Sequence, residues 1–156
     1  MADMGSILVI TAHPDDECLG AGGTIRNHTT AGIPVDVLCL TGNDTRNKEL
    51  TNACDMLGVR KVYSSHRGDS DIDRSLSDSV VEIILKSRPA VVITHSDEDY
   101  NRTHRICAEV VKESIEWASH KTIYDEAHRV ERILQMEINT LHSHPHFIVD
   151  ITASYD

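Results

Sequence analysis

The chain is poor in aromatic residues and in positive charge. Only 4% of its 156 residues are Phe, Trp or Tyr, against 40% that are apolar. A core of one domain's size must therefore be built mainly from aliphatic side chains. Fifteen Lys and Arg stand against 25 Asp and Glu, for a formal net charge of −10. Nonspecific binding to nucleic acid or to an anionic membrane needs clustered Lys and Arg, so neither partner is expected.

Closely spaced cysteines and membrane-length apolar runs are also missing. None of the four cysteines has Cys-x-x-Cys spacing, and three lie in apolar patterns, so buried reduced thiols are expected. We see no signal peptide and no apolar run long enough to cross a bilayer. These absences predict a cytoplasmic protein without a membrane segment. The oligomeric state is left open, a homo-oligomer included.

One short motif places a His and several acidic residues at the end of a predicted strand. Residues 12–17 read Ala-His-Pro-Asp-Asp-Glu and follow the apolar run 7–10. Polar side chains at the tip of a buried strand each need a partner. His13 and Asp16, three residues apart, can both reach one metal ion. Asp15 then points elsewhere and is available as a base, although it can also be explained as the cap of the following helix.

A second motif has the same setting. Residues 94–105 read Thr-His-Ser-Asp-Glu-Asp-Tyr-Asn-Arg-Thr-His-Arg, follow the apolar run 90–93, and lead into a helical pattern. If the strand order is 3-2-1-4-5, the carboxyl ends of strands one and four are neighbours at the point where the order reverses, which is where such sheets bind ligands. This topology brings His104 to His13 and Asp16, which makes these three the candidate metal ligands.

The pattern of apolar runs predicts the fold class. Continuous apolar strands alternate with amphipathic segments, which indicates a parallel sheet covered by helices on both faces. We expect an α/β, Rossmann-like, doubly wound and mostly parallel sheet in a single domain over 1–156. The expected strands are 6–12, 35–41, 61–64, 90–95, 132–138 and 147–151; the expected helices are 18–31, 46–57, 76–88 and 103–118.

The two motifs in this order resemble the PIG-L/LmbE-like family of zinc-dependent N-acetylglucosaminyl deacetylases. The match is strong at 12–17, good from 99 to 105, and weaker at 147–151. The resemblance implies a zinc hydrolase that removes the N-acetyl group from an N-acetylglucosamine-type sugar or its conjugate. Three protein ligands leave one zinc position open for water, and Asp15 would take a proton from that water. Other divalent metals suit the same ligands.

The resemblance also suggests substrate contacts and marks departures. Arg46 and Tyr100 are expected to contact the small amino-sugar substrate, although Arg46 and Glu49 also fit a surface i, i+3 pair. Many relatives carry His where this chain has Asn101, and Asp where it has Thr103. Asn101 can donate a hydrogen bond to an oxyanion but cannot deliver a proton. The general acid that protonates the leaving amine is therefore not identified, and the candidates are Asp15 and four histidines, His95, His142, His144 and His146.

Two further alternatives stay open. The glycines at 20–23 do not directly follow the strand, because His-Pro-Asp-Asp-Glu intervenes, so close helix–sheet packing explains them better than a dinucleotide-binding loop. Asn101, and a chain that ends earlier than most relatives, also fit a non-catalytic protein of the same fold that binds a metal or a carbohydrate. The end at Asp156 suggests either a short member or a truncated chain.

Overall fold

A parallel sheet of five strands forms the centre of the structure. The computed structural model describes residues 5–155, so the first four residues and Asp156 of the expected domain lie outside the described part. The strand order is β3-β2-β1-β4-β5 and every neighbouring pair is parallel, which confirms the predicted order and the α/β class. The elements are β1 (Ile7–Thr11), α1 (Asp16–Thr30), β2 (Val35–Cys39), α2 (Asp44–Leu57), β3 (Lys61–Tyr63), η1 (Asp69–Asp71), η2 (Arg74–Leu76), α3 (Ser77–Ser87), β4 (Val91–His95), α4 (Arg102–Ala118), β5 (Arg132–Met136) and η3 (Thr152–Ser154).

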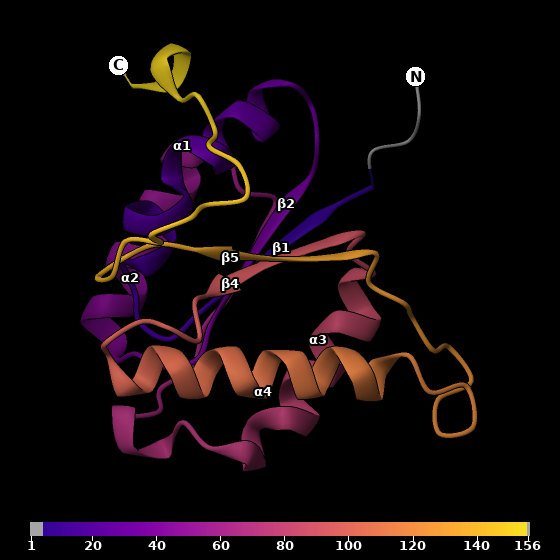
Figure 1. The fold of residues 1–156 in the computed structure, drawn as a ribbon. Helices are drawn as coiled ribbons and strands as arrows, with labels where there is room; N and C mark the ends of the chain where they lie inside the picture. Colours follow the sequence, from indigo (N-terminus) through magenta and orange to yellow (C-terminus); the bar gives the residue numbers. More distant parts are fainter. Residues whose placement is uncertain (1–4, 156) are drawn as a thin grey trace.

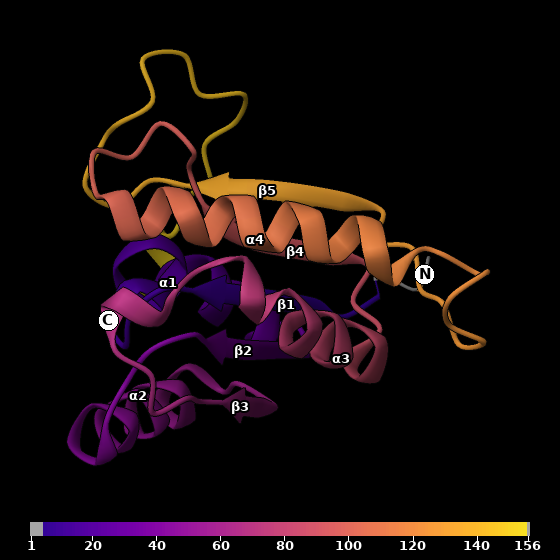
Figure 2. The same cartoon turned by 90° about the horizontal axis from the view of Figure 1, so that it is seen from below.

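Helices cover both faces of the sheet (Figure 1). Successive side chains of a strand point to opposite faces, so Leu8 and Ile10 of β1 pack with α3 and α4, while Ile7 and Val9 pack with α1 and α2. Figure 2 shows α4 running along β4 and β5. No Phe, Trp or Tyr is among the fully buried members of either cluster in the described chain, as the low aromatic content predicted.

Two helices begin earlier than expected, and for the second of them local capping is the reason. Helix α1 begins at Asp16 rather than at residue 18. Helix α2 begins at Asp44 rather than at residue 46, because the Asn43 side chain accepts a hydrogen bond from the Arg46 N–H at 3.0 Å. This contact satisfies one of the backbone donors that a helix leaves unpaired at its first turn.

The strand expected at 147–151 is wrong. These residues are irregular, and the side chain of Ile148 is 85% exposed. The Asp150 side chain accepts hydrogen bonds from the N–H and the hydroxyl of Thr152, which turns the chain, and the Asp150 carbonyl accepts from Asn27 of α1. High β propensity did not produce a strand because these backbone groups bond to a helix and a turn instead of to a neighbouring strand.

The glycines at 20–23 lie inside α1, not in a phosphate-binding loop. A Cβ at Gly20 would lie 2.7 Å from the Met136 sulfur, and a Cβ at Gly23 would lie 2.5 Å from Ile151. Both distances are too short for a side-chain carbon, so glycine lets β5 and the C-terminal segment approach the helix. The helix–sheet packing explanation is confirmed for Gly20, Gly23 packs closely against the C-terminal segment, and Gly22 has open space around it.

All four cysteines are free, and three of them are buried, while Cys18 is exposed. Burial raises the pKa of Cys39 and Cys54 to about 12, with nearby carboxylates adding to the effect for Cys54, so these thiols stay protonated at neutral pH. None of the described helices is long and apolar enough to cross a bilayer.

Candidate metal centre

The site lies where β1 and β4 end side by side. The two strands pair in parallel, so their carboxyl ends meet at one edge of the sheet. The turn after β1 carries His13 and leads into α1, whose first residue is Asp16. The segment after β4 leads into α4, whose first turn carries His104. Two chain segments 91 residues apart thus supply one cluster.

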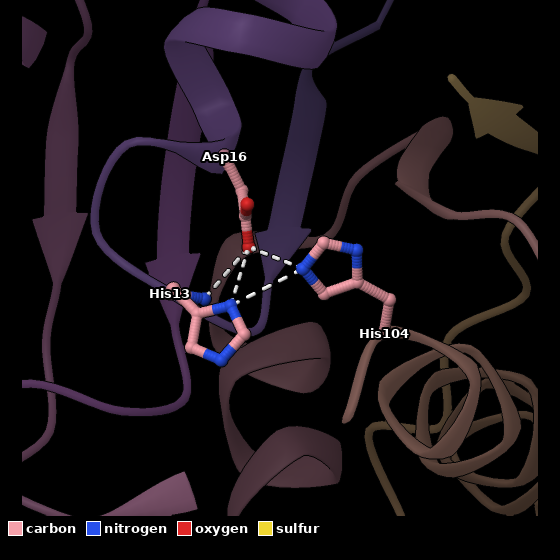
Figure 3. A group of neighbouring side chains, drawn as sticks. All are labelled: His13, Asp16 and His104. Carbon is pink, nitrogen blue, oxygen red and sulfur yellow. Dashed lines mark hydrogen bonds and ion pairs between the residues drawn. The ribbon is translucent and has the colours of Figure 1, made fainter. Parts of the chain in front are cut away.

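The three predicted ligands point at one another (Figure 3). His13 Nδ1 lies 3.2 Å from Asp16 Oδ2 and 3.2 Å from His104 Nε2, and His104 Nε2 lies 3.4 Å from Asp16 Oδ2. The side chains of Asp16 and His104 are buried, and that of His13 is 20% exposed. His104 therefore lies close enough to His13 for the two side chains to share one ion.

The spacing of these three atoms fits a metal ion. Ligand atoms at zinc distances of about 2.0–2.1 Å in a tetrahedral arrangement are separated by roughly 3.3–3.4 Å, which matches the observed distances. Two imidazole nitrogens and one carboxylate oxygen suit zinc and other divalent metals of similar size. The donor set and its geometry therefore fit a divalent ion with three protein ligands.

Electrostatics also favour a cation at this point. Burial opposes the charge of Asp16, but hydrogen bonds with His104 and His13 outweigh it and hold the pKa of this carboxyl far below its usual range. The hydrogen bond with Asp16 raises the pKa of His13 against the effect of burial. Burial lowers the pKa of His104, yet Asp16 and Asp99 together raise it above its ordinary value. The ionised carboxylate draws positive charge, which protons supply in the absence of metal.

A buried carboxylate holds His104 in place. Asp99 Oδ2 lies 3.2 Å from His104 Nδ1, and its other oxygen accepts the Asn101 N–H at 2.8 Å. The Asn139 N–H also donates to Asp99, at 3.3 Å. A carboxylate on the far nitrogen of a metal-ligating His fixes its tautomer and orientation. Because Asp99 contacts Nδ1 of His104, the other ring nitrogen, Nε2, faces the cluster.

A second carboxylate reaches His13 from the loop after β3. Asp69 Oδ1 lies 3.0 Å from His13 Nε2, and its side chain is 67% exposed. His13 therefore faces the cluster through Nδ1 and the loop through Nε2. The sequence motifs contain Asp99 but gave it no role, and nothing in the sequence pattern singled out Asp69.

Asp15 lies beside the ligands in an unusual backbone conformation. Its φ of 123° is one of two positive values at non-glycine residues in the described chain, and such a conformation typically costs about 1–3 kcal/mol. Its side chain makes no cap hydrogen bond to α1, so the capping explanation is not supported. The buried Glu17 side chain accepts the Asp15 N–H at 3.0 Å and helps to hold the turn.

Arg46 connects α2 to this turn. Its guanidinium donates to the Asp15 carboxylate at 2.8 Å and to the Pro14 carbonyl, and it also approaches Glu49 at 3.6 Å. The i, i+3 pair expected with Glu49 is thus present. The contact with Asp15 comes in addition, because the first turn of α2 faces the β1–α1 turn.

Asn101 is the cap of α4. Its Oδ1 accepts the Thr103 N–H at 2.8 Å, which assigns the oxygen and leaves the NH₂ group as the other end of the amide. Within residues 5–155 that NH₂ group has no hydrogen-bond partner, and Asn101 lines the cavity above the cluster. The residue can therefore stabilise a helix and donate into the cavity at the same time.

The cluster lies at the bottom of a polar cavity of about 460 Å³. This volume is within the usual range of small-molecule sites. The lining comes from the turn after β1, the start of α2, the loop after β3 and the start of α4. It consists of His13, Pro14, Asp15, Asp16, Leu19, Thr41, Gly42, Asn43, Arg46, Arg67, Gly68, Asp69, Asn101, His104, Ile138 and Asn139.

Several residues considered as acids or contacts lie outside this lining. His95 is fully buried behind His104, and its Nε2 accepts the Ala12 N–H at 2.8 Å. The ring of Tyr100 is not among the lining residues, and the residue is 74% exposed, so its substrate contact stays a prediction. The three C-terminal histidines do not line the cavity either; they are His142, His144 and His146.

Comparison with known proteins agrees with this geometry. Residues 8–115 match the family described as PIG-L, GlcNAc-PI de-N-acetylase. Diacetylchitobiose deacetylase of Thermococcus kodakarensis is 32% identical over 108 residues, covering 58% of this chain and 40% of the relative. The Bacillus cereus protein named Probable N-acetyl-alpha-D-glucosaminyl L-malate deacetylase 2 is 32% identical over 114 residues, covering 59% of this chain and 52% of the relative. The chain thus spans about half the length of these relatives or less.

A solved structure extends the similarity over nearly the whole chain. The conserved protein TT1542 from Thermus thermophilus superposes with a TM-score of 0.87 at 26% identity, covering 96% of this chain and 73% of that one. The C-terminal segment, which lies beyond the matched residues 8–115, is therefore included in a fold seen elsewhere.

Proposed function

Because the chain belongs to the GlcNAc-PI de-N-acetylase (PIG-L) family, we propose that it removes the N-acetyl group from an N-acetylglucosamine-type sugar or its conjugate, with zinc as the metal. The convergence of His13, Asp16 and His104 at the bottom of a polar cavity carries this proposal. The names of the matched relatives, which specify diacetylchitobiose and an N-acetylglucosaminyl malate, support an acetamido sugar as the substrate class.

The roles of the protein groups follow from their positions. When bound, zinc supplies a water of pKa near about 7 and a Lewis acid for the amide carbonyl. Asp15 lines the same cavity and is not a member of the ligand cluster, so its carboxylate acts as the base that accepts a proton from the attacking water. Arg46, at 2.8 Å, keeps this carboxylate in one orientation.

Asn101 and Asp15 divide the later steps between them. The Asn101 NH₂ group donates a hydrogen bond to the carbonyl oxygen as negative charge develops on it. The C–N bond then breaks, acetate leaves, and the amine needs a proton. Asp15 returns the proton that it took from water, because Asn101 has none to give and His95 is buried behind His104.

The test is acetate release by the purified chain loaded with one equivalent of zinc. Free N-acetylglucosamine and N,N'-diacetylchitobiose are the substrates, with a chelated sample and the Asp15→Asn variant as controls. We expect release that needs both the metal and Asp15. Metal and sugar binding without acetate release would instead support the alternative of a non-catalytic member of the fold.

A further inference from the structure

Arg67 is a cation of the cavity wall that lacks a partner. The other charged groups of the wall are engaged: Arg46 pairs with Asp15, Asp69 contacts His13, and Asp16 lies within the cluster. Between residues 5 and 155, no hydrogen bond or ion pair is formed by the Arg67 guanidinium.

Nearby acidic groups do not neutralise Arg67 by contact. The pKa of Asp73 is lowered mainly by its hydrogen bonds with Ser75, with a smaller effect from Arg67, and Asp73 caps the turn that follows. Asp69, two residues from Arg67, has its carboxylate at 3.0 Å from His13. The charge of Arg67 is therefore available to something that enters the cavity.

The backbone of Arg67 is held by hydrogen bonds, whereas its described side chain makes none. The Arg67 carbonyl accepts the Gly42 N–H at 3.0 Å, and the Arg67 N–H donates to the Ser65 hydroxyl at 3.1 Å. The Asn47 side chain donates to the Ser65 carbonyl at 2.8 Å. Gly42 allows this close approach, since a Cβ there would lie 2.9 Å from the Ser65 carbonyl oxygen. The guanidinium is thus presented from a rigid base, which lowers the entropy lost on binding.

Arg67 also borders a second cavity of about 310 Å³ between the β2–β3 edge and α3. Among the described residues, it is the one that lines both cavities. Hydroxyl groups line the second cavity beside it, including those of Ser64, Ser65 and Ser79. A substrate that extended from the first cavity towards the second would pass Arg67.

We propose that Arg67 binds an anionic group, carboxylate or phosphate, on the part of the substrate that is attached to the N-acetylated sugar. This inference rests on the proposed function and narrows its substrate class to anionic conjugates. The charges of the first cavity allow an anion: with a divalent ion bound, its wall carries three carboxylates, from Asp15, Asp16 and Asp69, against Arg46, Arg67 and two charges of the ion. Glu82 adds one carboxylate to the second cavity. A planar guanidinium is suited to either oxyanion.

The test compares anionic and neutral substrates in two variants. Arg67→Gln removes the charge at the cavity, and Arg74→Gln removes one on the same loop that lies near Glu113 and outside the cavity lining. Substrates are N-acetylglucosaminyl malate, N-acetylglucosamine 1-phosphate and N,N'-diacetylchitobiose. For Arg67→Gln we expect kcat/KM on the anionic substrates to fall about 10–100-fold, mainly through KM, with diacetylchitobiose unchanged. Arg74→Gln should resemble the parent throughout, and Arg67→Lys should recover part of the loss.

The three substrates distinguish a carboxylate from a phosphate as the group that Arg67 binds. A loss with the malate alone identifies a carboxylate, a loss with the phosphate alone identifies a phosphate, and either result supports the proposal. An equal fall on the neutral substrate, or no fall on any, overturns it. If the parent deacetylates nothing, the proposed function fails separately, and calorimetric binding of N-acetylglucosaminyl malate and of N-acetylglucosamine 1-phosphate tests the role of Arg67. Affinities for both that Arg67→Gln leaves unchanged, or no binding of either to the parent, overturn that role.

Discussion

The imidazole of His95 stacks on that of His104, with ring centroids 4.0 Å apart and planes inclined by 20°. His95 is fully buried, and burial lowers its pKa. Its Nε2 accepts the Ala12 N–H, so the neutral ring carries its proton on Nδ1, an atom without a described partner. His95 thus supports the ligand from behind, and its Nε2 also lies 3.3 Å from Asp16 Oδ2.

Replacing Asp15 by Asn should separate metal binding from turnover. Asn keeps the size of the side chain and tolerates a positive φ better than most residues, so the fold and the metal content should be retained. Loss of the base should lower kcat by about 10²–10⁴-fold. Acetate release and metal analysis of the same preparation measure both quantities. Asp55→Asn, on the exposed side of α2, is the matched control, and parental turnover in the Asp15 variant would remove this residue from the mechanism.

Asn101 needs variants that distinguish its two contacts. Asn101→Ala loses both the helix cap and the amide donor, so we expect a loss of about 1 kcal/mol in stability and of roughly 10²-fold in kcat. Asn101→Asp keeps a capping oxygen but has no NH₂ group, so it should lose rate while keeping the melting temperature.

Asn101→His restores the residue that many relatives carry. It should be tolerated or faster in turnover but lose the stability that the cap provides. A full pH–rate profile should keep both limbs in Asn101→Ala if Asp15 serves as base and acid. Unchanged rates for both Asn101→Ala and Asn101→Asp at every pH would show that the oxyanion donor is another group.

Removing Asp99 should weaken metal binding without removing a ligand. Without its carboxylate, His104 Nδ1 keeps the Asn139 side-chain amide at 3.4 Å but loses the charged partner that fixes the ring. Asp99→Ala should therefore lower zinc affinity about 10–100-fold. Competition with a chelator of known affinity measures this change. Asp97→Ala is the control, because Asp97 pairs with Lys112 at 2.5 Å on the outside of α4. Equal affinities in the two variants would argue against the orienting role.

Metal affinity should rise with pH across and above the ordinary His value of 6.5. His13 and His104 have raised pKa values in the metal-free protein because of Asp16 and Asp99, so they hold protons at a pH where an ordinary imidazole is neutral. A metal ion must displace these protons, which weakens binding on the acid side. Titrations from about pH 5.5 to about pH 8.5 should show proton release on zinc binding, and a flat profile would contradict it.

The strand-end argument predicted the metal ligands because it depends only on topology. Apolar runs place His13 and His104 just after two strands, and a doubly wound order makes those strands neighbours. The structure places the ligand atoms together at the adjacent ends of β1 and β4. The α/β class followed equally from the alternation of apolar strands and amphipathic helices.

The residues that support the ligands were not predictable in the same way. Asp69 reaches His13 from a loop whose path is set by contacts such as Asn47 with Ser65, and no sequence period encodes such a path. The C-terminal run 147–151 had the composition of a strand, but composition does not provide a partner edge. Both cases depend on where another segment lies, which a local pattern does not contain.

The 91-residue separation of His13 and His104 along the chain makes the metal a reporter of the whole fold. In an unfolded chain the two imidazoles are far apart on average, so tight binding requires β1 and β4 to be paired and α4 to be docked. A ligand that binds only the folded state stabilises it by about 2.7 kcal/mol at a concentration 100 times its dissociation constant. Zinc should therefore raise the melting temperature of the entire sheet, and stripping the metal should loosen elements that never touch it.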